Sequence, residues 1–108
     1  AATSQLMAHA NPPTAIFREN DEMAIGAIKC LKDQGIAVPE QVSVAGFDNI
    51  SFAEFCDPPL TTIAQPAEDF GRTAVNLLID VLEQRLRTAP KVILPFELVV
   101  RASTGPAR

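Results

Sequence analysis

The fold of this 108-residue chain is decided by residues 14–28, which read TAIFRENDEMAIGAI. The apolar run over 14–17 predicts a short strand, and apolar residues at helical spacing predict a helix over 21–34. A strand that passes so directly into a helix is typical of parallel α/β proteins. Polar residues at such a junction either cap the helix or bind a ligand, because ligands bind at the carboxyl ends of parallel strands.

The rest of the chain continues this alternation. We predict strands over 42–47, 61–65 and 91–101, a helical turn over 51–55 and a helix over 66–85. Residues 1–11 read as the end of a helix and a loop, and residues 102–108 as a loose tail. The order predicts a mostly parallel sheet covered on both faces, and Pro95 places the last strand at an edge or a bulge.

The composition is that of an ordinary globular domain. Apolar residues make up 47% of the chain and charged residues 20%, with a net charge of −4. An acidic chain without a basic cluster lacks the face with which proteins grip a phosphate backbone, so we expect it not to bind DNA by itself. Its apolar runs are too short to span a membrane.

The residues that could carry chemistry are few. Cys30 and Cys56 are the only cysteines, no CxxC is present, and His9 is the only histidine, so we expect two free thiols and no metal site. The sequence has no GxSxG, GxGxxG or P-loop, and Asp21 and Asp48 have no evident nucleophile beside them. We therefore expect a protein that is not an enzyme and holds no cofactor.

Polar side chains follow each of the first three predicted strands, as Asn20-Asp21, Asp48-Asn49 and Gln65. The carboxyl ends of parallel strands lie along one edge of the sheet, at the mouth of a crevice. Carboxylates accept hydrogen bonds from hydroxyls and amides both donate and accept, which suits a sugar or a nucleoside. The alternatives are simpler: Asn20 as a turn residue, Asp21 as a helix cap, Asp48-Asn49 as a turn and Gln65 as solvated loop.

Four stretches resemble one known family. They are NDEMAIGA (20–27), GIAVPEQVSVAGFD (35–48), PPLTTIAQ (58–65) and FELVVRAST (96–104), and they are similar in order and spacing to the C-terminal part of the LacI/GalR family of bacterial transcription regulators. The resemblance runs over roughly residues 13–104. One departure is Arg18-Glu19, which stands where the family usually has small residues before its Asn-Asp pair.

The resemblance implies an incomplete piece of a larger protein. Such regulators carry an N-terminal helix-turn-helix and a two-lobed, three-layer α/β effector domain of the periplasmic-binding-protein type (type I). This chain would supply part of the C-terminal lobe (1–65), a crossover helix belonging to the other lobe (66–86) and the closing strand and tail (87–108). DNA would be bound only through the missing N-terminal headpiece.

The resemblance also implies roles for particular residues. The effector would contact Asn20, Asp48 and Gln65, and Asp21 would then serve as the helix cap. A homodimer interface would include Ile25, Ile28 and Lys29 on the helix, and Phe55 and Cys56 on the loop. Phe52 and Phe55 agree with this, because they are large apolar groups in a segment too short to bury both, although they could also tuck under the sheet edge.

The function expected from these features is that of a cytoplasmic repressor that responds to a small hydroxyl-rich ligand, such as a sugar or a nucleoside. Binding of that effector would bias a two-lobed hinge and so alter the affinity for DNA at a distance. The alternative is a fragment of a periplasmic sugar-binding protein, which shares the fold. An α/β enzyme ranks well below both.

Overall fold

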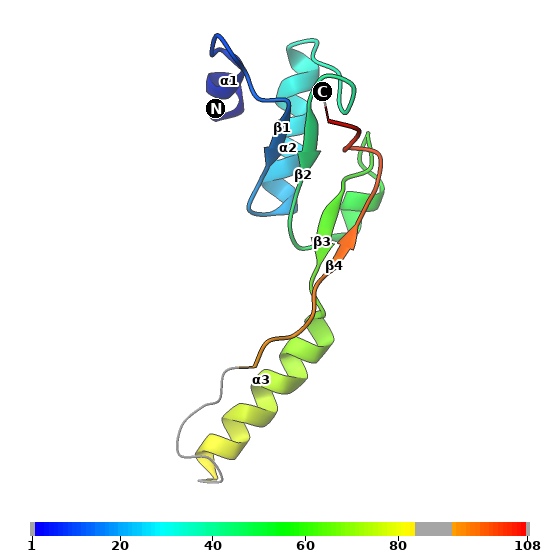
Figure 1. Ribbon diagram of the computed structural model, residues 1–108. Helices are drawn as coiled ribbons and strands as arrows, with labels where there is room; N and C mark the ends of the chain where they lie inside the picture. Colours follow the sequence, from blue (N-terminus) through cyan, green and yellow to red (C-terminus); the bar gives the residue numbers. More distant parts are fainter. Residues whose placement is uncertain (1, 84–91, 108) are drawn as a thin grey trace. The chain divides into compact units, whose positions relative to one another are not determined.

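The computed structural model describes residues 2–83 and 92–107 (Figure 1). The chain divides into two compact units: one comprises Ala1–Ala64 and Leu98–Arg108, and the other comprises Gln65–Glu97. The first unit is therefore built from two stretches that are distant in the sequence, with the second unit inserted between them.

The sheet of the first unit follows the predicted alternation. β1 (Ala15–Phe17) and β2 (Ser43–Ala45) are parallel, with Ile16 opposite Val44. Parallel bridges from Ala45 to Thr61 and from Asp48 to Ala64 connect β2 to β3 (Thr62–Ala64), and β3 pairs with β4 (Glu97–Val99). The predicted strands are confirmed, although each is shorter than its apolar run.

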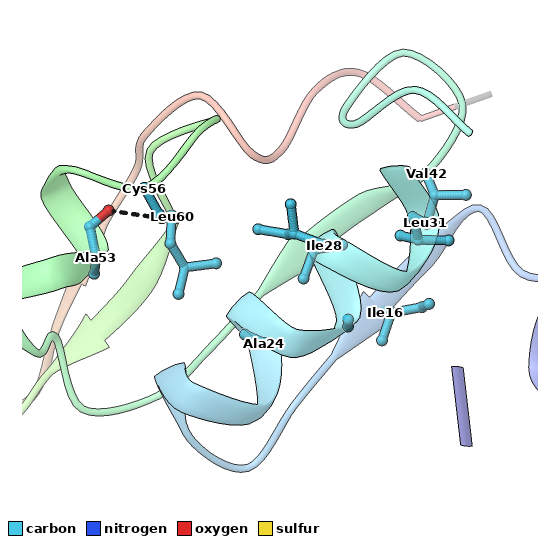
Figure 2. Close-up of a cluster of buried hydrophobic side chains, with 10 residues drawn as sticks. Ile16, Ala24, Ile28, Leu31, Val42, Ala53, Cys56 and Leu60 are labelled. Atoms are coloured by element: carbon cyan, nitrogen blue, oxygen red, sulfur yellow. Dashed lines mark hydrogen bonds between the residues drawn. The ribbon is translucent and has the colours of Figure 1, made fainter. Parts of the chain in front are cut away.

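One long helix covers this sheet and forms the core with it. α2 (Asp21–Asp33) ends beside Gly35, whose φ of 73° is the left-handed conformation that glycine adopts freely. Figure 2 shows Ala24, Ile28 and Leu31 on α2 and Ile16 on β1, all within the buried cluster. The opposite face of β1 carries Phe17, which is exposed, so within this unit helices cover only one face of β1.

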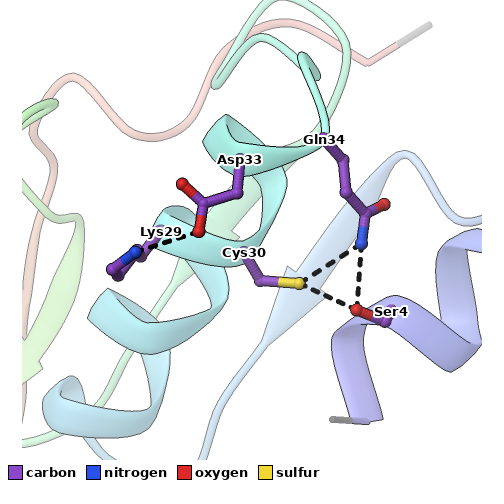
Figure 3. A network of polar contacts seen from close by, with 5 residues as sticks. All are labelled: Ser4, Lys29, Cys30, Asp33 and Gln34. Atoms are coloured by element: carbon purple, nitrogen blue, oxygen red, sulfur yellow. Dashed lines mark hydrogen bonds and ion pairs between the residues drawn. The ribbon is translucent and has the colours of Figure 1, made fainter.

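A short N-terminal helix, α1 (Ala2–Met7), packs against α2 through polar contacts (Figure 3). The Ser4 hydroxyl lies 3.1 Å from the Cys30 sulfur, and Gln34 Nε2 donates to Ser4 Oγ at 2.9 Å. These contacts hold the predicted end-of-helix segment against α2. Cys30 is therefore a half-buried free thiol within a polar contact.

The predicted loose tail is wrong for residues around Ser103, which is fully buried. The Ser103 hydroxyl accepts from the Thr61 N–H and donates to the Val44 carbonyl, while the Ser103 carbonyl accepts from the Val44 N–H. The segment after β4 therefore joins β2 to the start of β3. The sequence does not indicate that Ser103 is buried, because a stretch rich in Ser, Thr and Gly is also typical of loops.

The second unit contains α3 (Ala67–Leu82), which confirms most of the predicted helix; residues 84–85 lie outside the described part. α3 buries none of its residues, and Phe70, Leu78 and Val81 of its apolar stripe are exposed. Within this unit the ring of Phe70 lies 6.1 Å from that of Phe96. An apolar cavity of about 220 Å³ lies there, lined by Phe70, Thr73, Ala74, Leu77, Val92 and Leu94.

The last predicted strand is much shorter than expected. Residues 92–96 are not in a strand, and β4 begins only at Glu97, after Pro95. A proline lacks the N–H that a ladder needs, so its place just outside the strand fits the expected interruption. Residue 91, where the predicted strand began, lies outside the described residues.

Candidate functional site

The carboxyl ends of the first three strands lie side by side. Phe17 at the end of β1 is opposite Ala45 of β2, and the Arg18 N–H donates to the Ala45 carbonyl at 2.9 Å. Beyond β2, the Asp48 N–H donates to the Ile63 carbonyl of β3 at 3.0 Å. The parallel register therefore brings the polar residues that follow β1 and β2 to one edge of the sheet.

Asn20 caps α2, so the expectation that Asp21 would be the cap is wrong. Asn20 has extended backbone angles, and its Oδ1 accepts from the Met23 N–H at 2.8 Å. The N-cap is the residue with extended backbone just before the helix, and its side-chain oxygen accepts a hydrogen bond from the first turn. An amide oxygen or a carboxylate oxygen can do this, so the sequence does not distinguish Asn20 from Asp21. The capping contact uses one atom of a half-buried side chain, Oδ1.

Asp48 and Asn49 form a turn with left-handed backbone. Their φ angles are 123° and 60°, which residues with a side chain adopt rarely. Asp48 is exposed at the sheet edge, and Asn49 is half-buried. The left-handed backbone of this pair is the conformation that the turn interpretation implies, while Asp48 also forms a parallel bridge with Ala64 of β3.

Gln65 directly follows β3 and is half-buried. The preceding residue, Ala64, forms a parallel bridge with Asp48. Gln65 is therefore the next residue in the chain after the bridge partner of Asp48. Gln65 begins the second unit, while Asn20 and Asp48 belong to the first. Whether Asn20, Asp48 and Gln65 converge on one ligand therefore stays a prediction.

Sequence reasoning missed the role of Asp21, a fully buried carboxylate. Its Oδ2 accepts from the Ile50 N–H at 2.8 Å, and its Oδ1 accepts from the Thr62 hydroxyl at 2.6 Å. Burying a charge is costly unless hydrogen bonds replace water, and these two contacts supply that replacement. Gly46 packs against Oδ1 closely enough that a β-carbon there would collide with it.

Arg101 is a second residue that sequence reasoning missed. Its Nη2 donates to Asn49 Oδ1 and its Nη1 donates to the Leu60 carbonyl, both at 2.9 Å. The planar guanidinium thus joins the turn after β2 to the segment before β3. An arginine after an apolar strand carries no local signal of this role, because its partners are 41 and 52 residues away in the sequence.

All five residues predicted to form a dimer interface come together around one groove of about 390 Å³. Ile28 and Cys56 are buried, whereas Phe55 is 73% exposed. The groove is lined by Ile25, Ile28, Lys29, Lys32, Asp33, Phe52, Phe55, Cys56 and Asp57. Phe52 is also exposed, so the alternative that both phenylalanines tuck under the sheet edge is wrong for this chain.

Charged pairs border this groove. Lys32 Nζ lies 3.1 Å from Asp57 Oδ2, and Lys29 Nζ lies 2.9 Å from Asp33 Oδ2 (Figure 3). The hydrogen bond and the negative charge of Asp33 raise the pKa of Lys29. Both pairs are exposed, and such pairs add little to stability. The groove thus has an apolar floor with charges beside it, an arrangement typical of protein interfaces.

Cys56 is a buried free thiol. It donates to the Ala53 carbonyl at 3.4 Å (Figure 2) or to the Pro58 carbonyl at 3.3 Å. Burial raises the pKa of the Cys56 thiol, and the nearby backbone hydrogen bonds offset part of that increase. Cys56 is therefore neutral at physiological pH and packs as a small buried apolar residue.

Within the described parts of the chain, no group of three or more His, Cys, Asp or Glu side chains is placed to hold a metal ion. Among those same residues, no helix has the length and apolar character that crossing a bilayer requires.

Comparison with known proteins shows the family to which this fold belongs. Residues 1–104 match the family model described as periplasmic binding protein-like domain, and the chain belongs to that family. The resemblance to the C-terminal part of LacI/GalR effector domains is confirmed by the relatives that it matches. The chain spans only about 30% of the length of the first curated relatives.

Three relatives illustrate the match. The transcriptional repressor CytR of Escherichia coli K12 is 47% identical over 103 residues, which are 95% of this chain and 30% of CytR. A crystallised lac repressor dimer bound to operator and an anti-inducer has a TM-score of 0.86 at 33% identity, over 95% of this chain and 36% of that one. A LacI family regulator from Enterococcus faecium with bound ribose has a TM-score of 0.82 at 37% identity, over 98% and 39%.

Proposed function

We propose that this chain is the C-terminal effector-binding and dimerisation part of a LacI-family transcriptional regulator that acts as a repressor in the cytoplasm. The observation that carries the proposal is the adjacency of the first three strand ends, each followed by a polar side chain. The relatives are named as transcription regulators, which favours this reading over a periplasmic sugar-binding protein.

The proposed ligand is a small hydroxyl-rich molecule such as a sugar or a nucleoside. Asn20 offers an amide, Asp48 an exposed carboxylate and Gln65 a second amide, and together these groups can both donate to and accept from hydroxyls. The similar regulator from Enterococcus faecium carries ribose, which supports this class of ligand.

Two further parts of the proposal concern the assembly. The groove beside α2, with Phe52 and Phe55 exposed, would form the homodimer contact, and the similar lac repressor structure is a dimer. α3 would pack in the whole protein against the other lobe of the effector domain, which would cover the stripe that is exposed here. DNA would be bound by a headpiece that precedes this chain.

Calorimetry on the whole regulator with a panel of D-ribose, D-glucose, cytidine and adenosine tests the ligand class. Asp48→Ala should weaken binding of the responding ligand by about 1.5–3 kcal/mol, the scale of a hydrogen bond to a charged group. Glu40→Ala is the matched control, because Glu40 is an exposed carboxylate in another loop. Equal affinity of wild type and Asp48→Ala would remove Asp48 from the site.

A further inference from the structure

Three consecutive backbone N–H groups in the turn after β2 each have a fixed acceptor. Asp48 N–H donates to the Ile63 carbonyl at 3.0 Å, Asn49 N–H to Thr62 Oγ1 at 3.3 Å, and Ile50 N–H to Asp21 Oδ2 at 2.8 Å. The last two acceptors are side chains. The turn is therefore held by residues from α2 and β3, not only by a backbone ladder.

Thr62 couples these contacts to one another. Its hydroxyl accepts from the Asn49 N–H and donates to Asp21 Oδ1 at 2.6 Å, and both Thr62 and Asp21 are fully buried. Because the carboxylate can only accept, the hydroxyl proton must point at Asp21, which leaves the hydroxyl oxygen free to accept from the turn. Arg101 Nη2 also contacts the same turn by donating to Asn49 Oδ1 at 2.9 Å.

The turn needs this support because of its backbone conformation. Asp48 and Asn49 both have positive φ, and neither is a glycine. Such conformations persist only where the surroundings fix them, and they concentrate at ligand-binding positions. The surroundings here consist of the three N–H contacts and the guanidinium of Arg101.

We propose that Asp21, Thr62 and Arg101 are positioning residues that hold Asp48 and Asn49 in this left-handed conformation. Asp48 itself is exposed, whereas Asp21 and Thr62 are fully buried and Arg101 is half-buried, so in this proposal they act on the ligand only through the backbone of Asp48 and Asn49. The consequence for ligand affinity rests on the proposed function, in which Asp48 contacts the effector. The effect on the turn does not, since it is a property of the ligand-free protein.

The test compares Thr62→Val with Thr62→Ser in the whole regulator. Valine keeps the shape of threonine but removes the hydroxyl, whereas serine retains it. Thr3→Val is the control, because Thr3 is also a buried threonine but lies in α1, far in the sequence from residues 48–50. The first readout is amide hydrogen exchange in peptides that cover residues 46–52, and the second is calorimetry with D-ribose and cytidine.

Thr62→Val should speed exchange over this peptide by about tenfold, and Thr62→Ser and Thr3→Val should stay close to wild type there. Binding of the responding ligand should weaken in Thr62→Val and recover in Thr62→Ser. Arg101→Leu provides a second route if the valine variant does not fold, because Arg101 is only half-buried. It should speed exchange of the same peptide.

Exchange over 46–52 that stays at the wild-type rate in both Thr62→Val and Arg101→Leu would overturn the inference, whatever the ligand affinity. Faster exchange in these variants, together with unchanged affinity in Asp48→Ala, would support the positioning network and reject Asp48 as a ligand contact. The failure of the inference and the failure of the proposed function are thus distinguishable.

Discussion

Gly46 lies against the buried carboxylate of Asp21, and no β-carbon fits between them. A β-carbon on Gly46 would also lie 3.1 Å from Ala24 Cβ and 3.1 Å from Leu60 Cδ2. The close approach of the strand end to α2 therefore depends on a residue without a side chain. It is this approach that lets Asp21 accept from Ile50, four residues beyond Gly46.

Gly46→Ala should destabilise the protein by about 1–3 kcal/mol, the usual cost of forcing extra volume into a packed interior. Urea unfolding followed by circular dichroism measures this. Gly26→Ala is the control, because Gly26 lies inside α2 with no atom near its added β-carbon. That change should stabilise by about 0.5–1 kcal/mol, since alanine favours helix over glycine. Equal stability of Gly46→Ala and wild type would contradict the packing described.

Cys56 should make stability fall as the pH rises above about 9, near the ordinary pKa of 9.0 for a thiol. Burial raises the pKa of Cys56 in the folded state, so the unfolded chain loses the thiol proton first. The unfolded state then binds fewer protons than the folded state, and rising pH favours unfolding. Chemical unfolding between pH 7 and 10 should show this slope in wild type and a smaller one in Cys56→Ala. Parallel curves for the two proteins would disprove it.

Phe55→Ala should weaken homodimerisation of the whole regulator. Phe55 is 73% exposed beside an apolar groove, and truncation of a central interface aromatic typically costs about 2 kcal/mol or more. Analytical ultracentrifugation over a dilution series measures the dimer dissociation constant. Met23→Ala serves as the control, because Met23 is an exposed apolar residue of α2 that does not line the groove. An unchanged dissociation constant for Phe55→Ala would place the dimer contact elsewhere.

The chain studied by itself should self-associate through α3. Phe70, Leu78 and Val81 of α3 are exposed, and each large apolar side chain removed from water contributes roughly 1.5–3 kcal/mol. We expect an intertwined or swapped homodimer, since exchange of an element restores buried surface without new sequence. Sedimentation equilibrium at micromolar concentration should give a dimer, and Leu78→Glu should shift it towards monomer. A wild-type chain that stays monomeric would refute this expectation.

The sequence predicted the elements well where a local pattern determines them. The helix over 21–34 has its apolar residues at helical spacing and a glycine after its end, and α2 matches it closely. The strand over 91–101 is predicted from alternation, with an interruption at Pro95, and of its described residues, 92–101, only Glu97–Val99 form a strand. Alternation indicates that a segment can form a strand, but the segment also needs a neighbouring strand whose backbone N–H and C=O groups are available for hydrogen bonds.

The site was predicted less completely, because its support is non-local. Asn20 and Asp21 are adjacent polar residues, and nothing in the sequence says which of them is buried. That is decided by Thr62, whose hydroxyl meets Asp21 across 41 residues of chain. Arg101 reaches Asn49 across 52 residues for the same reason. Patterns in a single sequence identify groups at strand ends, but not the distant side chains that hold them.

The contacts of Ser103 also bear on how this protein is made. Ser103 joins the Val44 carbonyl of β2 to the Thr61 N–H, so a stretch emerging late from the ribosome closes strands that emerged long before. Until then β2 and the start of β3 lack these partners, and the loops to be closed span 59 and 42 residues. The hydrogen bonds of Ser103 can therefore form only after residue 103 has left the ribosome, so the contact between β2 and the start of β3 depends on a later part of the chain.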